Sequence, residues 1–521
     1  MTKFPLLAVA SAVVLSACGG GGADSGGPET VDNSGGRGTL QFNPPLRVTA
    51  LTAAEFTARL NETASGKQLL AVAGTPKCGV NFHYIQYGTV GGANEATTAS
   101  GALMVPTGTD PACAGPKPIV LYAHGTTTDK NYNIADILDS TRPGASEGSL
   151  VGALYAAQGF TVVAPNYAGY TGSTLPYHPY LNADQQSKDM IDALTAARKA
   201  LPGLGGATDS GKLLVTGYSQ GGYVALATQR ALQAAGQTVT AAAPLSAPSA
   251  ISLLVDYASL GAPALGGTVF TPLLSTSWQK QFGNVYTAPT DLYEAQYATG
   301  IETLLPSTTP VNTLFATGRL PQTALYPANA VPGPALPAFA AFYGPNNLLT
   351  QRFLTASAVD ATAANPCPGN AFPATAASRT STSPLACAPA VGFRRAAVAN
   401  DLRNFVPSRP VFFCGGANDP TVNFESTRST AGYFAARGVP AAALTVLDLE
   451  TAPTSAADPF ATAKGGFAQA KAATAAQVAA AGGSATAQAQ AVTTAYHGTL
   501  VPPFCNAAAR GFFQQVLAAG G

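Results

Sequence analysis

The sequence predicts an α/β fold: a mostly parallel central sheet flanked by helices and interrupted by an inserted cap subdomain. Three observations lead to this prediction. Short apolar runs alternate with helical patterns from residue 118 onward. The runs are continuously apolar, as in PIVLYA at 118–123, which is typical of parallel strands buried on both faces. Residues 249–395 then break the alternation over a length that a structureless loop rarely reaches.

The elements can be placed in order along the chain. A lead-in at 40–75 contains a helical pattern at 51–65. The expected strands lie at 79–90, 98–106, 118–123, 159–165, 213–217, 239–245, 410–414 and 441–449. The expected helices lie at 149–158, 184–201 and 220–235. We expect residues 40–248 and 396–521 to form the two parts of the core, 249–395 to form the cap or lid, and the Ala- and Gln-rich stretch 455–492 to form one or two helices.

Composition excludes several classes of protein. The 521 residues are 46% hydrophobic and only 10% charged, with 27 Lys and Arg against 26 Asp and Glu. This apolar content suffices for a large core and excludes disorder over most of the chain. Because there is no basic run, nucleic acid is not an expected partner.

The N-terminus has the pattern of an export signal. Lys3 precedes an apolar run at 4–17, which is shorter than the ~20 residues that a spanning helix needs. The run ends in LSAC at Cys18, which resembles the lipobox of bacterial lipoproteins, where the cysteine is lipidated after cleavage. We therefore expect a signal peptide at 1–17 and a membrane anchor on Cys18. The alternative is a plain signal peptide that contains a cysteine.

The residues after the predicted cleavage site indicate a linker and a cellular location. Residues 18–39 are glycine-rich and are predicted to be a flexible tether. Gly19, rather than Asp, after the cysteine favours the outer membrane or cell surface of a Gram-negative cell. A periplasmic or secreted protein is the alternative.

Six further cysteines agree with export, because disulfides persist in oxidising compartments. They are Cys78, Cys113, Cys367, Cys387, Cys414 and Cys505. Six cysteines allow about 15 pairings, of which the local pairs 78–113, 367–387 and 414–505 are favoured. Free buried thiols are the alternative. No spacing of cysteines and histidines fits a zinc site, so no metal is expected.

The pattern G-x-S-x-G occurs twice, at Ser146 (GASEG) and at Ser219 (GYSQG). A nucleophilic serine of this kind sits on a sharp turn between a strand and a helix, and the glycines avoid clashes there. LLVT precedes and GYVALATQ follows the second match, whereas TRP precedes the first. Ser219 is therefore the candidate nucleophile, and Ser146 is expected to cap a helix.

The base and the acid should follow the serine in the order serine, acid, histidine. Of the four histidines (His83, His124, His178 and His497), only His497 follows Ser219. It is predicted to lie in a loop beyond the last strand. Asp419 follows the strand PVFFC in a turn rich in Gly and Asn, and is the candidate acid; Asp448 and Asp458 are its rivals.

Two backbone N–H groups are candidate donors to a developing oxyanion. One belongs to Gln220, directly after the serine, whose side chain has no role in this scheme. The other belongs to Thr126, in the loop HGTT after the strand at 118–123. His124 is expected to shape that loop rather than to transfer protons, and His83 is expected to be structural.

Together LLVTGYSQGG, YAHGTT, ANDPTV and YHGT resemble the α/β-hydrolase superfamily, and within it bacterial exported esterases and secretory lipases. The resemblance covers roughly 75–248 and 396–510, and it departs from the family at Asn166, where an aspartate is common. It implies a serine hydrolase that cleaves carboxylic esters through Ser219, Asp419 and His497, without a cofactor.

Alternatives remain for the substrate. A serine peptidase on the same fold, an esterase that depolymerises polyesters or plant esters, and a non-catalytic surface binding protein are each compatible with the fold. The apolar, Pro-rich stretch 334–347 of the cap suggests apolar pocket walls, and hence an apolar ester.

Overall fold

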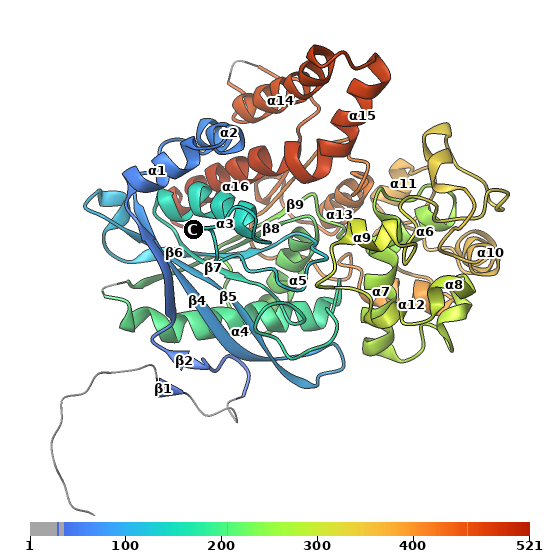
Figure 1. Cartoon of the computed structure of the whole chain (residues 1–521), viewed down its shortest axis with the longest axis horizontal. Helices are drawn as coiled ribbons and strands as arrows, with labels where there is room; N and C mark the ends of the chain where they lie inside the picture. The colour runs from blue at the N-terminus through green and yellow to red at the C-terminus, as the bar shows by residue number, and fades with distance from the viewer. Residues whose placement is uncertain (1–28, 31–35, 206, 456) are drawn as a thin grey trace, which may run out of the picture.

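The computed structural model describes residues 29–30, 36–205, 207–455 and 457–521 (Figure 1). The predicted signal peptide at 1–17 and the lipidation site Cys18 lie outside the described residues. Within the described part of the chain, no helix combines the length and the apolar character needed to cross a bilayer.

A nine-stranded sheet forms the centre of the protein, in the order β11-β10-β9-β8-β6-β7-β5-β4-β3. Its strands are β3 (Leu46–Leu51), β4 (Gly79–Val90), β5 (Ala96–Thr107), β6 (Lys117–Ala123), β7 (Thr161–Pro165), β8 (Asp209–Tyr218), β9 (Ala241–Leu245), β10 (Val411–Gly415) and β11 (Leu444–Asp448). Each predicted strand is present. Strand β3 was not predicted, because it is an edge strand whose residues are all at least partly exposed and it lacks an apolar run.

The sheet is mostly parallel, as predicted. All neighbours from β11 to β7 run parallel, whereas β5 pairs antiparallel with β7 and β4, and β4 with β3. Figure 1 shows α4 (Ala183–Ala200) below the strands, and α3 (Ala145–Leu154) and α16 (Val501–Ala518) above them. Helix α5 (Gln220–Ala234) packs against α4 and β8.

Two predicted helices differ in detail. The pattern at 51–65 is divided into α1 (Ala53–Asn61) and α2 (Ala64–Ala73), because the Thr63 hydroxyl accepts a hydrogen bond from Gly66 N–H and starts a new helix. Ser146 does not cap α3: Gly144 occupies the cap position in a left-handed conformation, and Ser146 is exposed in the first turn.

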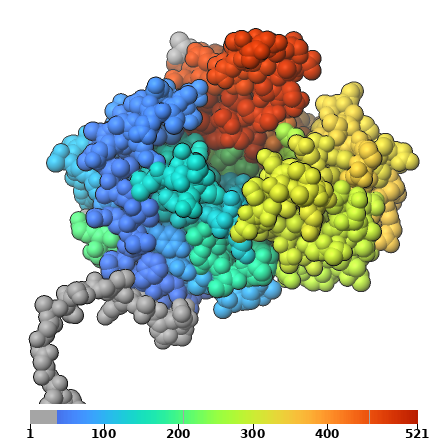
Figure 2. Space-filling model, viewed as in Figure 1, coloured from blue at the N-terminus to red at the C-terminus, as the bar shows by residue number. Residues whose placement is uncertain are grey.

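The segment between β9 and β10 is helical, and Figure 2 shows it as a yellow-green lobe beside the core. It contains α6 (Ile251–Ser259), α7 (Gly267–Phe282), α8 (Ala295–Ala298), α9 (Val311–Ala316), α10 (Gln351–Val359), α11 (Ala376–Arg379) and α12 (Gly392–Ala399). Arg394 on α12 bonds Asp256 and Asp360, at 2.7 Å to each. These fully buried charges join three helices of the segment.

The stretch predicted as one or two helices forms two. Helices α14 (Ala461–Ala480) and α15 (Ala485–Ala495) make a hairpin, drawn in orange and red at the top of Figure 1. A π-helical turn, Tyr496–Leu500, then leads directly into α16.

The predicted tether is fixed to the protein at its end. Arg37 forms an ion pair of 3.0 Å with Asp192 on α4, and Gly38 N–H bonds Gly88 O. Short strands Glu29–Thr30 (β1) and Phe42–Asn43 (β2) also pair with each other. The last four residues of the predicted tether, 36–39, therefore lie against the body of the protein.

Three disulfides join the favoured pairs. They are Cys78–Cys113, Cys367–Cys387 and Cys414–Cys505. The last one connects β10 to α16, two elements that flank the site described next.

Candidate active site

Ser219 lies at the turn between β8 and α5 with φ at +59° and ψ at −121°. A residue with a side chain rarely adopts this conformation, so the turn is strained. The neighbouring backbone leaves no room for other side chains: a Cβ at Gly217 or Gly221 would lie 2.4 or 1.9 Å from Ala123 O. The framing predicted for the second G-x-S-x-G match is therefore present, with the glycines that it requires.

His497 meets Ser219 across this turn, with Nε2 2.7 Å from the serine Oγ. The histidine does not lie in a loop, as the sequence suggested, but in the π-helical turn between α15 and α16. Such turns interrupt regular helix geometry and are frequent at functional sites. The Tyr218 hydroxyl donates to His497 O at 2.6 Å, which holds the turn against the end of β8.

Asp419 completes the chain of contacts, with Oδ2 2.6 Å from His497 Nδ1. Its other oxygen accepts hydrogen bonds from the N–H groups of Thr421 and Val422, at 2.9 and 3.0 Å. With the carboxylate side chain only 1% exposed, the imidazole is the group that can donate to Oδ2. The Nδ1–H tautomer follows, and it leaves Nε2 free to accept the serine proton.

The two rival carboxylates are engaged elsewhere. Asp448 Oδ1 accepts from the N–H groups of Ala417 and Glu450. Asp458 pairs with Lys464 at 2.8 Å, and this hydrogen bond, together with two from backbone N–H groups, lowers the pKa of the Asp458 carboxyl to about 2. Asp448 thus holds the turn that carries Asp419, whereas Asp458 fixes the start of α14.

The loop after β6 passes beside the serine. A Cβ at Gly125 would lie 3.9 Å from the Ser219 Cβ. Within the described residues, neither Gln220 N–H nor Thr126 N–H has an intramolecular acceptor. Gln220 is the first residue of α5, where N–H groups have no partner in the helix. Both predicted donors are therefore available to a bound oxyanion.

Glu147 holds this loop in place, a role that sequence reasoning missed. Its Oε1 accepts from Gly125 N–H at 3.1 Å and from the Tyr122 hydroxyl at 2.9 Å. Its Oε2 accepts from the Tyr132 hydroxyl at 2.8 Å. The first G-x-S-x-G match, GASEG, thus supports the loop through Glu147 and not through Ser146.

His124 shapes the same loop, as expected. It is fully buried between the rings of Tyr132 and Tyr167, with centroids 4.2 and 4.1 Å away. Its Nδ1 lies 2.6 Å from Gly125 O. That carbonyl and Thr126 N–H belong to one trans peptide, so they point in opposite directions. Holding the carbonyl therefore also orients the donor.

His178 plays a comparable part for the second donor, and sequence reasoning gave it no role. The Gln220 side-chain amide donates to His178 Nε2 at 2.6 Å, and His178 Nδ1–H donates to Ala168 O at 2.9 Å. Burial lowers the pKa of His178 to about 3, so the ring is neutral and can accept. The Gln220 side chain, which the sequence scheme did not need, therefore anchors the start of α5. His83 is buried on β4, in the antiparallel part of the sheet.

Ser219 opens into an apolar hollow of about 120 Å³ under the helical segment. Its walls include Tyr180, Ile251, Leu254, Val255, Phe270, Leu274, Leu325, Tyr326, Phe353 and Phe393. The stretch 334–347 was expected to supply these walls and does not. Tyr326 connects this stretch to the hollow. It lines the hollow, and its ring packs against that of Tyr343, with centroids 5.1 Å apart.

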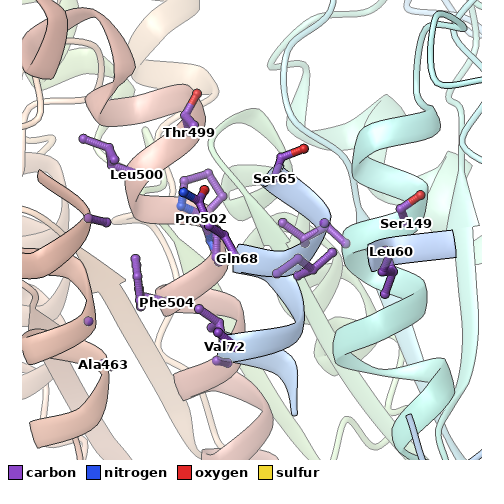
Figure 3. Close-up of a pocket in the computed structure, with 18 of the residues that line it drawn as sticks. Leu60, Ser65, Gln68, Val72, Ser149, Ala463, Thr499, Leu500, Pro502 and Phe504 are labelled. Atoms are coloured by element: carbon purple, nitrogen blue, oxygen red, sulfur yellow. The ribbon is translucent and has the colours of Figure 1, made fainter. Parts of the chain in front are cut away.

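A larger hollow of about 1260 Å³ lies between α2, α3, α14 and α16 (Figure 3). Figure 3 shows Val72 and Gln68 of α2 facing Phe504 and Pro502 of α16. Ser219, Asp419 and His497 are not among its lining residues. It is a different hollow from the one beside Ser219, although Gly498 and Thr499, which follow His497, line it.

Comparisons with known proteins agree with this architecture. A profile of the prolyl oligopeptidase family matches residues 149–249, which include Ser219. The crystal structure of a rice cell wall degrading esterase, LipA from Xanthomonas oryzae, is 25% identical, with a TM-score of 0.61, over 82% of this chain and 95% of that one. A structure from Legionella pneumophila, 17% identical, covers 90% of this chain and 96% of that one with a TM-score of 0.59.

A search of curated proteins found no match. The mostly parallel sheet with its flanking helices and the similarity to the LipA structure nevertheless indicate the same fold. The chain therefore has the α/β-hydrolase fold, of the type found in the LipA esterase.

Proposed function

We propose that the protein hydrolyses carboxylic esters with Ser219 as nucleophile, His497 as base and Asp419 as the acid that orients the histidine. One observation carries this proposal: two hydrogen bonds, of 2.7 and 2.6 Å, run from Ser219 through His497 to Asp419. This is the arrangement that activates a serine hydroxyl.

The chemistry has two halves. His497 Nε2 takes the proton of Ser219 Oγ as the oxygen attacks the ester carbonyl, and the N–H groups of Gln220 and Thr126 stabilise the negative oxygen that forms. The protonated histidine then gives its proton to the departing alcohol, and an acyl group remains on Ser219. Water, deprotonated by His497, attacks this acyl group, and collapse of the second tetrahedral intermediate releases the acid and restores the serine.

The hollow beside Ser219 is expected to take the apolar part of the ester. A volume of about 120 Å³ is close to the ~150 Å³ cavity that accommodates benzene in another protein. Short acyl chains and single aromatic rings therefore fit, whereas long chains would need the helical segment to move. Because LipA degrades rice cell walls, ester groups of plant polymers are a second candidate substrate class.

A peptidase is the alternative function, favoured by the prolyl oligopeptidase profile over residues 149–249. The test is a series of p-nitrophenyl esters, from acetyl to palmitoyl, run beside aminoacyl p-nitroanilides. We expect hydrolysis of the esters, fastest at short chain lengths, and none of the anilides. Faster cleavage of anilides would favour the peptidase, and the loss of all ester hydrolysis would refute the proposal.

We further propose that the protein is exported and attached to a membrane through Cys18. The three disulfides support export, because such bonds persist in oxidising compartments. Mass spectrometry of the mature N-terminus checks the anchor. A diacylglyceryl group on Cys18 is expected, and an unmodified cysteine there would contradict it.

A further inference from the structure

The hairpin of α14 and α15 contacts the catalytic elements through Glu450, which follows β11. One carboxylate oxygen of Glu450 accepts from the Tyr496 hydroxyl at 2.6 Å, and the other pairs with Lys471 of α14 at 2.5 Å. The glutamate side chain is only 17% exposed. Burial would raise the pKa of this carboxyl, but the hydrogen bonds from Lys471 and Tyr496 outweigh burial and lower it, so the charged form is stabilised.

Tyr496 directly precedes His497 and lies against the turn that carries Asp419. A Cβ at Gly416 in that turn would lie 2.1 Å from the Tyr496 hydroxyl, so only glycine fits beneath the phenol. Tyr496 as a whole is 3% exposed. Tyr496 thus gives the acid turn and the base turn a second contact, besides the one between Asp419 and His497.

Helix α14 packs against Tyr496. The Phe467 ring packs edge-on against the Tyr496 ring, with centroids 5.5 Å apart. Lys471 lies one turn further along α14, with its ammonium 4.9 Å from the Phe467 centroid. The red lobe at the top of Figure 1 therefore reaches the site through Phe467 and Lys471, on a face of α14 next to the one that lines the hollow in Figure 3.

We propose that α14 positions the acid–base pair, with Glu450 and Lys471 as positioning residues. The inference rests on the proposed function, because it concerns the roles of Asp419 and His497. Two short turns supply those side chains, and a displacement of about 1 Å at a reacting group can cost roughly 100-fold in rate. The ion pair of Glu450 and Lys471, which holds the Tyr496 hydroxyl, opposes such a displacement.

The test compares two lysines of the same helix. Lys471→Met leaves an unbranched side chain only one atom shorter and removes its charge, and we expect kcat to fall roughly 10-fold while KM stays unchanged. Lys471→Arg restores the charge and is expected to recover most of kcat. Lys464→Met is the matched control, because Lys464 pairs with Asp458 and bonds Ala452 O instead. We expect that variant to lose thermal stability and to keep kcat.

Two readouts separate this inference from the proposed function. Hydrolysis of p-nitrophenyl butyrate reports the ester reaction, and the labelling rate of Ser219 by a fluorophosphonate reports the acid–base pair without a choice of ester. If the wild type labels rapidly but cleaves no ester, the proposed function fails, and labelling alone decides the inference. Wild-type rates in Lys471→Met, or equal loss of rate in Lys464→Met, would overturn it.

Discussion

Asp419 Oδ2 lies 2.6 Å from His497 Nδ1, although 78 residues separate the two in the chain. The intervening residues include β11 and the whole α14–α15 hairpin. The Cys414–Cys505 disulfide spans the same region and ties together the elements at its two ends. The segment between Asp419 and His497 is thus held at its two ends by the disulfide and by the hydrogen bond between these two residues.

Asp419→Asn should lower kcat by about 10⁴-fold, because an amide can donate to Nδ1 and so stabilise the wrong imidazole tautomer. Steady-state kinetics with p-nitrophenyl butyrate measure this. Asp458→Asn is the control, since that carboxylate pairs with Lys464. If Asp419→Asn retained more than a tenth of the wild-type kcat, Asp419 would not be the acid.

Glu147→Ala should lower kcat by roughly 10- to 100-fold, somewhat less than the loss of a donor itself. Removing the carboxylate frees Gly125 N–H and the hydroxyls of Tyr122 and Tyr132, so the loop that carries Thr126 loses its anchor. The neighbouring Ser146→Ala change affects an exposed side chain and should leave kcat unaltered. Equal kcat in the two variants would contradict the role given to Glu147.

His178→Gln should change how stability depends on pH. Burial lowers the pKa of His178 from 6.5 to about 3, so between these values only the unfolded chain binds the proton. The free energy of unfolding should therefore fall as the pH drops through this window, by about 1.4 kcal/mol per pH unit from this group. Glutamine cannot titrate, yet its oxygen can still accept from Gln220.

Chemical denaturation at pH 6, 5 and 4 measures that effect. As the pH drops over this range, the free energy of unfolding should fall more steeply in the wild type than in the variant. The difference should be about 1.4 kcal/mol per pH unit, which corresponds to one proton. Because the other ionisable groups are common to both proteins, their contributions cancel in the difference. Identical slopes would show that His178 is protonated in the folded protein.

Removing the Cys414–Cys505 disulfide by Cys→Ser changes should cost about 2–4 kcal/mol of unfolding free energy. It closes a loop of 91 residues, against 35 for Cys78–Cys113. In the chain-entropy account the longer loop should cost about 1 kcal/mol more. Denaturant titrations of both double variants provide the comparison, and a larger loss for the shorter loop would contradict that account.

The sequence predicts the strands of the parallel sheet and the candidate triad because their patterns are local. Ser219 is framed by an apolar strand and a helix, and Asp419 follows another strand at once. His497 follows from chain order, since the remaining histidines precede Ser219. Only its surroundings differ, because helices α15 and α16 continue through it as a π-helical turn.

The supporting residues could not be predicted in this way. Glu147 reaches Gly125 across 22 residues, and His178 reaches Gln220 across 42. Their contacts depend on how α3 and the loop before α4 pack on the sheet, which no spacing in the sequence encodes. The same holds for Lys471, an isolated charge in an Ala-rich stretch until the fold places it against Glu450.

The most direct test of the central claim is to find which residue a phosphonate labels. The purified protein is treated with a fluorophosphonate, digested and mapped by mass spectrometry. The account predicts one adduct, on Ser219, in the wild type, and none in Ser219→Ala or after denaturation. An adduct on Ser146 or another residue, or no adduct in the folded wild type, would contradict it.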